Sequence, residues 1–265
     1  MYSSFQLAKK YLHYWFTASS GKGHGIHSPF VFDFIKQVLN DKEQYPVHKK
    51  IEARRKELLQ DNNRIEVQDF GAGSAVIKTR SRKISAIATS SLKQKKFAQL
   101  LYRVAAYYKP AVIVELGTSF GTTTSYLATG NPYAKVYSCE GAPAIAAIAR
   151  QSFEQLQLDN IELTEGDFTL ILPALLARIP APGLVFIDGN HQQQPTLDYF
   201  QQFLQYAREE TILVFDDIHW SAGMEAAWEQ IKADPAVTLS IDLFFIGIIL
   251  LRKDFKAKQH FTIRF

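Results

Sequence analysis

The segment that most constrains this chain runs from Ala111 to Ala128 and reads AVIVELGTSFGTTTSYLA. Its first residues, Ala111 to Val114, have the continuous apolar pattern of a buried strand, and the run after Gly121 is compatible with a helix. A strand that enters a helix through a glycine turn brings backbone N–H groups and the positive end of the helix to one point. Gly117 can adopt a positive φ and, because it has no Cβ, lets a ligand approach closely. The segment therefore predicts a nucleotide-type binding turn.

The spacing of this turn argues against a dinucleotide. A dinucleotide site uses G-x-G-x-x-G, in which the middle glycine admits a pyrophosphate. Here the pattern is E-x-G-x-x-x-G, with Ser119 at the middle position, and the carboxylate of Glu115 would repel a phosphate. A ligand with a cationic, amino-acid-like end suits such an acid better. The stretch VELGTSFGTTTSYLA resembles motif I of the class I S-adenosylmethionine-dependent methyltransferases, in the E-L-G-x-x-x-G form of the catechol O-methyltransferase-like branch.

The composition is that of a globular protein. The 265 residues are 47% hydrophobic and 13% aromatic, which is enough for a full core. The single cysteine, Cys139, excludes an internal disulfide and most cysteine-built metal sites. No apolar run approaches the roughly 18 residues of a membrane span, and the first residues lack the order of a signal peptide. We therefore expect a cytoplasmic protein.

Charge is distributed unevenly along the chain. Residues 1–110 carry 20 Lys and Arg against 8 Asp and Glu, a formal charge of +12, whereas the remainder carries 10 against 18, a charge of −8. This asymmetry predicts two regions with different roles. We expect an N-terminal helical cap with a basic loop over residues 1–90 and a cofactor-binding methyltransferase domain over residues 91–265.

From residue 111 onward, apolar strand patterns alternate with helical patterns. Strands are expected at 111–116, 134–139, 160–164, 183–187 and 210–216, with a final pair near 237–251, and helices at 121–129, 143–156, 168–178, 193–207 and 222–233. This order predicts an α/β fold with a mainly parallel sheet and helices on both faces. The final pair leaves no room for a helix, so it should form an antiparallel hairpin. The resemblance implies the Rossmann-like, seven-stranded methyltransferase topology, with strand order 3-2-1-4-5-7-6.

The N-terminal region is predicted to be helical. An apolar stripe from Phe5 to Trp15 has helical spacing, and Ser28-Pro29 should cap and open a second helix. A charged third helix is expected at about 47–59, and a further helix from residue 91 to Lys109. The loop GKGHGIHSPF contains His24 and His27, which we interpret as part of a structural turn or a substrate-facing loop rather than a metal site.

Residues 71–83 are predicted to form a mobile basic loop. It carries Lys78, Arg80, Arg82 and Lys83, and would cover an active site, grip an anionic substrate or simply be solvated. The preceding D-F-G-A-G-S, residues 69–74, is similar to another form of motif I. It lacks a strong apolar strand before it and a convincing helix after it, so we do not expect it to bind the cofactor.

The ends of the second and third strands carry acidic residues, which should lie at the ligand edge of the sheet. Glu140-Gly141 lies about 20 residues beyond the glycine turn, where an acid would bind ribose hydroxyls. By resemblance, Asp167 contacts the adenine amino group and Phe168 packs beside the ring. The predicted cofactor site comprises Glu115, Gly117, Thr118, Ser119, Gly121, Thr122, Glu140, Gly141, Asp167, Phe168 and Asp188.

The fourth and fifth strands also end in carboxylates, at Asp188 and at Asp216-Asp217. Acids on neighbouring strand ends repel unless a cation holds them together or one is protonated. Three oxygen ligands suit Mg²⁺, Mn²⁺ or Ca²⁺. The pattern resembles the metal-dependent O-methyltransferases, which implies that Asp188, Asp216 and Asp217 are the metal ligands.

Two histidines are candidates for the general base. His191 stands three residues after Asp188, where that family has a catalytic lysine, and His219 is the second candidate. A histidine can accept a proton near neutral pH without a strongly shifted pKa. We therefore predict catalytic roles for His191, Asp188 and His219.

The sequence thus predicts methyl transfer from S-adenosylmethionine to a hydroxyl of a small, anionic or neutral acceptor, with or without a divalent metal. The segments GHGIHSPFVF, IDGNHQQQPTLDYF and KQHFTIRF also resemble a Bacteroidetes-type group of class I methyltransferases. Two alternatives remain: methylation of RNA or another polyanion, favoured by the basic first part, and a non-catalytic cofactor-binding module. The oligomeric state is left open.

Overall fold

The computed structural model describes residues 1–69, 78–255 and 257–265, and the chain divides into two compact units. The terminal unit comprises Met1–Asp41 and Pro180–Phe265, and the central unit comprises Lys42–Ile179. The boundary predicted at residue 90 falls inside a helix of the central unit, Ile84–Ser91. Among the described residues, no helix combines the length and the apolar character that crossing a membrane requires.

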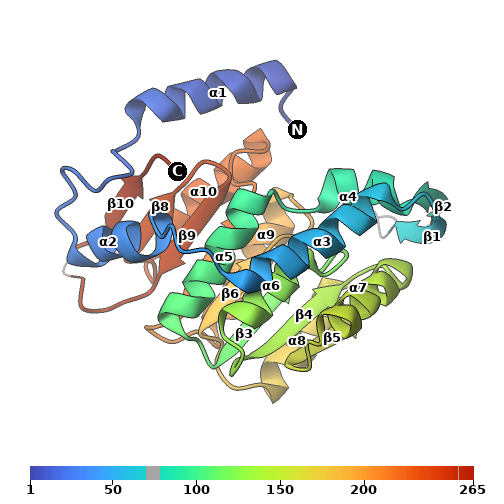
Figure 1. Ribbon diagram of the computed structural model, residues 1–265. Helices are drawn as coiled ribbons and strands as arrows, with labels where there is room; N and C mark the ends of the chain where they lie inside the picture. Colours follow the sequence, from blue (N-terminus) through green and yellow to red (C-terminus); the bar gives the residue numbers. More distant parts are fainter. Residues whose placement is uncertain (70–77, 256) are drawn as a thin grey trace. The chain divides into compact units, whose positions relative to one another are not determined.

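The central unit contains a parallel sheet and the helices that follow its strands (Figure 1). Its elements are α3 (Pro46–Gln60), β1 (Arg64–Asp69), β2 (Lys78–Lys83), α4 (Ile84–Ser91), α5 (Lys95–Tyr108), β3 (Val112–Leu116), α6 (Thr122–Gly130), β4 (Lys135–Glu140), α7 (Pro143–Leu156), β5 (Ile161–Glu165) and α8 (Phe168–Arg178). The strands lie in the order β3-β4-β5 and all pair in parallel. The predicted strands and helices of this stretch are confirmed to within a few residues.

The register brings the carboxyl ends of these strands to one edge. Leu116 of β3 is opposite Cys139 of β4, and Glu140 of β4 is opposite Glu165 of β5. All five residues of β3, four apolar residues and Glu115, are buried, so the strand is covered on both faces. The loops that follow the strands therefore share one edge of the sheet, where open α/β sheets bind their ligands.

The region predicted as a basic loop contains a strand instead. Lys78–Lys83 forms β2 and pairs antiparallel with β1, with Val67 opposite Arg80. The residues before D-F-G-A-G-S, which lack the pattern of a strong apolar strand, form the strand β1. The loop prediction is wrong for residues 78–83 because Ile65 and Val67 pack in a hydrophobic cluster with α4 and α7, and the polar partner strand completes the ladder. Residues 70–77, with most of the D-F-G-A-G-S segment, lie outside the described residues.

The terminal unit contains the other strands and the first helices of the chain (Figure 1). Its elements are α1 (Ser4–Thr17), α2 (Pro29–Phe34), the π-helical turn η1 (Ile35–Leu39), β6 (Leu184–Ile187), α9 (Gln193–Leu204), β7 (Ile212–Asp216), α10 (Ala222–Ala233), β8 (Leu239–Asp242), β9 (Ile246–Leu250) and β10 (Gln259–Thr262). The strands lie in the order β10-β8-β9-β7-β6.

The predicted C-terminal hairpin is confirmed. β8 and β9 pair antiparallel, β9 also pairs antiparallel with β7, and β7 is parallel to β6. β10 is an additional strand that the seven-strand prediction lacks, and it pairs in parallel with β8. It was missed because its four residues, QHFT, are short and mostly polar, and only pairing with β8 orders them.

One predicted helix start differs in detail. Pro29 is the first residue of α2, as expected, and the Ser28 carbonyl accepts from the Phe32 N–H. The Ser28 hydroxyl, however, makes no capping hydrogen bond and is buried. The helix continues only to Phe34 before the π-helical turn, so the predicted cap by the Ser28 side chain is wrong.

Candidate functional site

The glycine turn after β3 has the backbone that its sequence predicts. Gly117 and Gly121 have φ values of 98° and 79°, and Ser119 between them has a φ of 49°. The N–H groups of Gly117 and Thr118 both donate to the Cys139 carbonyl of β4, at 2.9 and 3.1 Å. The turn is thus bonded to the neighbouring strand, and α6 begins directly after it at Thr122.

Gly121 is required for steric reasons as well. A Cβ built at this position would lie 2.4 Å from the ring of Phe153 in α7. The absence of a side chain lets α7 pack directly against the start of α6, where Thr122 and its neighbours are buried. The packing of α7 therefore helps to fix the position of the turn.

Glu115 lies inside the unit and not at its surface. The side chain has no exposed area, and one carboxylate oxygen, Oε2, accepts from the hydroxyls of Thr124 and Ser138 at 2.5 and 2.6 Å. The Ser138 hydroxyl also bonds that of Thr118. These contacts connect β3, β4 and α6 around the turn. Direct contact of Glu115 with a cofactor stays a prediction, and its observed contacts give it a role in fixing the turn.

Glu140 connects the end of β4 to the same turn. Its two carboxylate oxygens accept from the backbone N–H groups of Ser119, at 2.8 Å, and Ala142, at 3.0 Å. Burial raises the pKa of Glu140, although its backbone hydrogen bonds, including one from Gly141, oppose the shift. The acid predicted to bind ribose is therefore held rigidly beside the turn.

The strand β5 is followed by a helix cap. Gly166 follows β5 with a φ of 140°, and the Asp167 carboxylate accepts from the Thr169 N–H at 2.8 Å, which caps α8. Asp167 is exposed and Phe168, the first residue of α8, is half-buried. The predicted contacts of this pair with adenine stay predictions.

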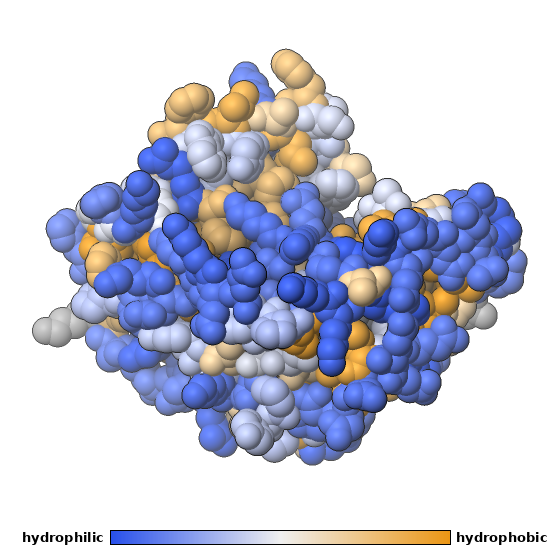
Figure 2. All heavy atoms as spheres, in the orientation of Figure 1, coloured by the Kyte–Doolittle hydropathy of each residue, from blue (hydrophilic) through white to orange (hydrophobic). Residues whose placement is uncertain are grey.

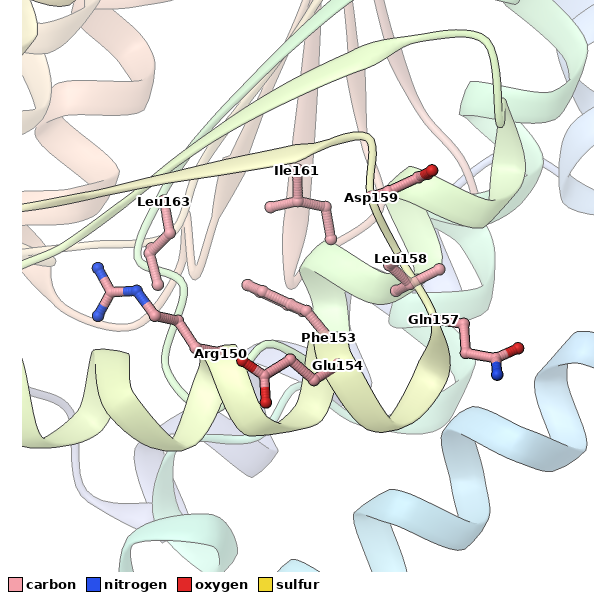
Figure 3. Close-up of a pocket in the computed structure, with 8 residues that line it drawn as sticks. All are labelled: Arg150, Phe153, Glu154, Gln157, Leu158, Asp159, Ile161 and Leu163. Atoms are coloured by element: carbon pink, nitrogen blue, oxygen red, sulfur yellow. The ribbon is translucent and has the colours of Figure 1, made fainter.

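A shallow hollow in the central unit lies at the opposite edge of the sheet (Figure 3). It is lined by residues of α7 and of the start of β5, among them Phe153, Gln157, Leu158 and Ile161. Parallel strands bind ligands at their carboxyl ends, and these residues precede or begin a strand. The hollow is therefore not the predicted cofactor site.

In the terminal unit, the ends of β6 and β7 bring two acids and a histidine together. Ligand atoms of Asp188, His191 and Asp216 all lie within 4.8 Å of one another. His191 Nε2 is 3.4 Å from Asp188 Oδ1, and Asp216 is only 1% exposed. We call these three residues the acid–histidine cluster. Two of the three predicted metal ligands are in it.

The third predicted ligand, Asp217, is not in this cluster, and His191 stands there instead. Asp217 has a φ of 51°, and its N–H donates to the Phe245 carbonyl at 2.7 Å. Consecutive residues of a strand point to opposite faces, so Asp216 and Asp217 diverge as β7 ends. Two carboxylates and an imidazole can hold a divalent ion, but the imidazole is a softer donor than the oxygens preferred by Mg²⁺ and Ca²⁺.

His219 is engaged in a separate network. Its Nδ1 is 2.9 Å from a Glu225 oxygen and its Nε2 is 2.8 Å from an Asp242 oxygen. Burial lowers the pKa of His219, but the hydrogen bonds and charges of Asp242 and Glu225 outweigh burial and raise it. A ring with carboxylates at both nitrogens is a charged structural contact, and these contacts do not support a base role for His219.

The sequence reasoning missed several of these contacts. Nothing in local spacing brings Ser91, at the end of α4, to 2.8 Å from the Ser119 hydroxyl, or Ser138 to Glu115. The alternation of β4 could have identified Ser138 as a buried polar residue beside the turn. His24 and His27 are exposed in the loop before α2, outside the acid–histidine cluster.

The sequence of the glycine turn and the strands after it matches a family model described as a methyltransferase domain, over residues 114–218. Residues 114–218 are thus similar to a methyltransferase domain. The match begins inside β3 and ends just after Asp217, so it includes the glycine turn, Glu140 and the acid–histidine cluster. The predicted resemblance to the methyltransferases is confirmed.

Among curated proteins, the chain is similar to the O-methyltransferase imqG of Aspergillus flavus. The two are 29% identical over 127 residues, which are 46% of this chain and 50% of that protein. The matched region thus spans about half the length of this relative.

Solved structures of O-methyltransferases have a similar fold over most of the chain. An O-methyltransferase from Bacillus cereus, in complex with SAH, is 19% identical, with 83% of this chain and 97% of that chain covered and a TM-score of 0.54. TomG from Streptomyces achromogenes, in complex with SAM, is 18% identical, with 84% and 96% covered and a TM-score of 0.55. The SAH-bound methyltransferase PaMTH1 of Podospora anserina is 15% identical, with 85% and 97% covered and a TM-score of 0.58. These likenesses confirm the predicted Rossmann-like α/β fold.

Proposed function

We propose that this protein is an S-adenosylmethionine-dependent O-methyltransferase that acts on a hydroxyl of a small molecule. The observation that carries the proposal is the glycine turn after β3, held by the Cys139 carbonyl and by Glu140. Solved relatives of the same fold contain SAM or SAH. The curated relative imqG and several structural neighbours are O-methyltransferases, which favours oxygen as the methyl acceptor.

The central unit would bind the donor. The turn around Gly117 and Ser119 would let the methionine part approach closely, because Gly117 has no side chain, and Glu140 can accept further hydrogen bonds from ribose hydroxyls. Asp167 and Phe168 would bind the adenine. When bound, S-adenosylmethionine supplies a methyl group attached to a sulfonium sulfur, and this sulfur is a good leaving group because it departs as a neutral thioether. The contribution of the chain is to hold and orient the donor.

The terminal unit would activate the acceptor. We infer that His191 accepts the proton of the acceptor hydroxyl and that Asp188, 3.4 Å away, orients its ring. General-base catalysis of this kind contributes about 10²–10⁴-fold. The acid–histidine cluster could alternatively hold a divalent ion through Asp188, His191 and Asp216, which would lower the pKa of the hydroxyl. Among the metals predicted, the imidazole donor disfavours Ca²⁺ and Mg²⁺ relative to Mn²⁺.

A second candidate acceptor is a polyanion such as RNA. The β1–β2 ribbon has exposed Arg64, Arg80, Arg82 and Lys83. A basic ribbon of this kind suits phosphate contacts. If it bound RNA, the logarithm of the binding constant would fall linearly with the logarithm of salt concentration, and R80A/R82A would flatten that slope. We rank this candidate second because Glu66 interrupts the basic surface of the same ribbon.

We also propose a cytoplasmic location, since the lone Cys139 is buried as a free thiol.

The experiment that tests the proposal combines calorimetry with a methyl-transfer assay. Titration of the full chain with S-adenosylhomocysteine should release or absorb heat with one-site stoichiometry. Methyl-labelled S-adenosylmethionine should then label an acceptor in a panel of phenols and alcohols. A folded protein that gives no binding signal would refute the proposal, and binding with no labelled product on any acceptor, RNA included, would support a non-catalytic module.

A further inference from the structure

The outer face of α1 exposes an unusual amount of apolar surface. Five large apolar residues at the start of the chain are exposed: Met1 at 84%, Phe5 at 80%, Leu12 at 56%, Trp15 at 42% and Phe16 at 81%. Apolar side chains gather over α1 in the space-filling view (Figure 2). Since an aromatic side chain has about 150–250 Å² of surface, these residues together expose on the order of 600 Å². That is as large as the largest apolar patch expected on an ordinary monomer.

The helix is anchored to the terminal unit through its other face. Tyr11 and Tyr14 pack against Phe244, with ring centroids 5.1 and 5.3 Å away. The Lys10 ammonium lies 3.0 Å from Glu225, which also accepts from the Tyr2 hydroxyl at 2.7 Å. α1 therefore presents its outer face from a fixed position, and the exposure of that face is not the consequence of a detached helix.

The exposed residues have the spacing of a helix–helix seam. Phe5, Lys9, Leu12 and Phe16 are all exposed and follow one another at intervals of four, three and four residues. This is the alternation of the d and a positions of a heptad, with a single lysine at one a position. We call these four residues the outer stripe. A partner helix and a lipid surface both accept an apolar face of this spacing, and the test below distinguishes them.

We propose that the outer stripe is a dimer interface, in which α1 packs antiparallel against α1 of a second copy of this chain. Such a contact is isologous, so the same patch must complement itself. In the antiparallel arrangement Phe5 meets Phe16 of the other copy, and Lys9 meets Leu12. A parallel arrangement would instead bring the two Lys9 ammonium groups together, in a helix that contains no acidic residue.

The available area fits a dimer. A stable interface buries about 800 Å² per partner. The apolar residues of α1 and Met1 supply most of this, and polar neighbours such as Gln6 and His13, which are also exposed, would form the rim.

The test measures the mass of the full chain by sedimentation over a range of concentrations. The wild-type chain, of 30.1 kDa, should sediment as a dimer at micromolar concentration. F5E/F16E should weaken dimerisation by at least about 30-fold, because it places four carboxylates in the seam. F5E/F16K should dimerise more tightly than F5E/F16E, since each introduced carboxylate would face an introduced ammonium group of the other copy, and this recovery should fade at high salt.

Controls separate the interface from folding and from a lipid surface. Both positions are about four-fifths exposed, so the variants should keep the wild-type circular dichroism and melting temperature. Y133E, at a residue 96% exposed elsewhere on the chain, should leave the mass unchanged. A monomeric wild type, a dimer indifferent to F5E/F16E, or an F5E/F16K chain as weak as F5E/F16E would overturn the proposal. So would a monomer that cosediments with phosphatidylserine vesicles, which would assign the stripe to a membrane surface.

Discussion

Single residues in the central unit fix the glycine turn through contacts that are distant in sequence. Glu115 accepts hydrogen bonds from hydroxyl groups of α6 and β4, and Glu140 accepts hydrogen bonds from the backbone N–H groups of Ser119 and Ala142. Glu140 accepts through both of its oxygens and Glu115 through Oε2, from donors that belong to the turn or its neighbours. A buried carboxylate without such donors would cost several kcal/mol, so these hydrogen bonds are a condition of the local fold.

The first prediction concerns Gly121. In Gly121→Ala, the new Cβ would overlap the Phe153 ring and the residue would keep a left-handed φ. We expect the free energy of unfolding to fall by about 2–4 kcal/mol, and affinity for S-adenosylhomocysteine to fall with it. Gly25→Ala is the matched control, because Gly25 has a φ of 78° and no atom of the described part of the chain lies within 4 Å of its Cβ position.

Gly25→Ala should lower the free energy of unfolding by about 1 kcal/mol, because only the left-handed backbone is unfavourable for alanine there. It should leave cofactor affinity unchanged. Urea unfolding of both variants measures the difference. Equal losses in the two would show that the contact with Phe153 is not the reason for the glycine at position 121.

The second prediction concerns the pH dependence that Glu140 introduces. Its pKa is raised by burial, so between the unfolded and folded pKa values the folded chain binds more protons than the unfolded chain. The free energy of unfolding contributed by this group therefore decreases as pH rises through that window. The ionised carboxylate is the better acceptor for the Ser119 N–H and for ribose hydroxyls, so cofactor affinity should change in the opposite direction.

Calorimetry with S-adenosylhomocysteine at a series of pH values measures this effect. Affinity should fall as pH is lowered through the raised pKa of Glu140, and Glu140→Gln should bind more weakly at neutral pH and lose this dependence. An unchanged pH profile in Glu140→Gln would show that another group titrates.

At the scale of elements, regular local patterns sufficed to predict most helices and strands. α7 was predicted with the bounds observed, Pro143–Leu156, because a proline opens it and its apolar residues recur at helical spacing. Elements that depend on a distant partner were missed. β2 is entirely polar, with the sequence KTRSRK, and forms only because β1 is beside it.

The third prediction compares two serines that begin helices. Ser221 caps α10, since its hydroxyl accepts from the Met224 N–H at 3.2 Å, whereas the buried Ser28 hydroxyl has no hydrogen-bond partner among the described residues and caps nothing. Ser221→Ala should lower the free energy of unfolding by about 1 kcal/mol. Ser28→Ala should be neutral or slightly stabilising, because it removes a buried hydroxyl without a hydrogen bond. Denaturant unfolding distinguishes them, and a larger loss in Ser28→Ala would contradict the observed capping.

At the scale of the whole molecule, binding and catalysis should be separable. Residues proposed to bind the donor belong to the central unit, and residues proposed to accept the proton belong to the terminal unit. A ligand at a hundred times its Kd stabilises a protein by about 2.7 kcal/mol, so S-adenosylhomocysteine should raise the melting temperature.

The fourth prediction uses this shift. Asp188→Ala and His191→Gln should each lower kcat by about 10²–10⁴-fold while keeping the thermal shift with S-adenosylhomocysteine. In Asp216→Asn, loss of activity together with loss of a thermal shift by Mn²⁺ would show that the acid–histidine cluster holds a metal. Loss of the cofactor shift in Asp188→Ala would contradict the proposed division of roles.

Local sequence was sufficient to specify the α/β alternation, the glycine turn, the C-terminal hairpin and the acids at the strand ends. These features depend on periodicity and on backbone preferences, which act over a few residues. Tertiary packing was needed to establish that His191 and not Asp217 joins Asp188 and Asp216, that Glu115 is buried among hydroxyls, and that the apolar stripe of α1 is exposed. Each of these depends on which side of an element a residue occupies after packing, and local sequence does not specify what packs there.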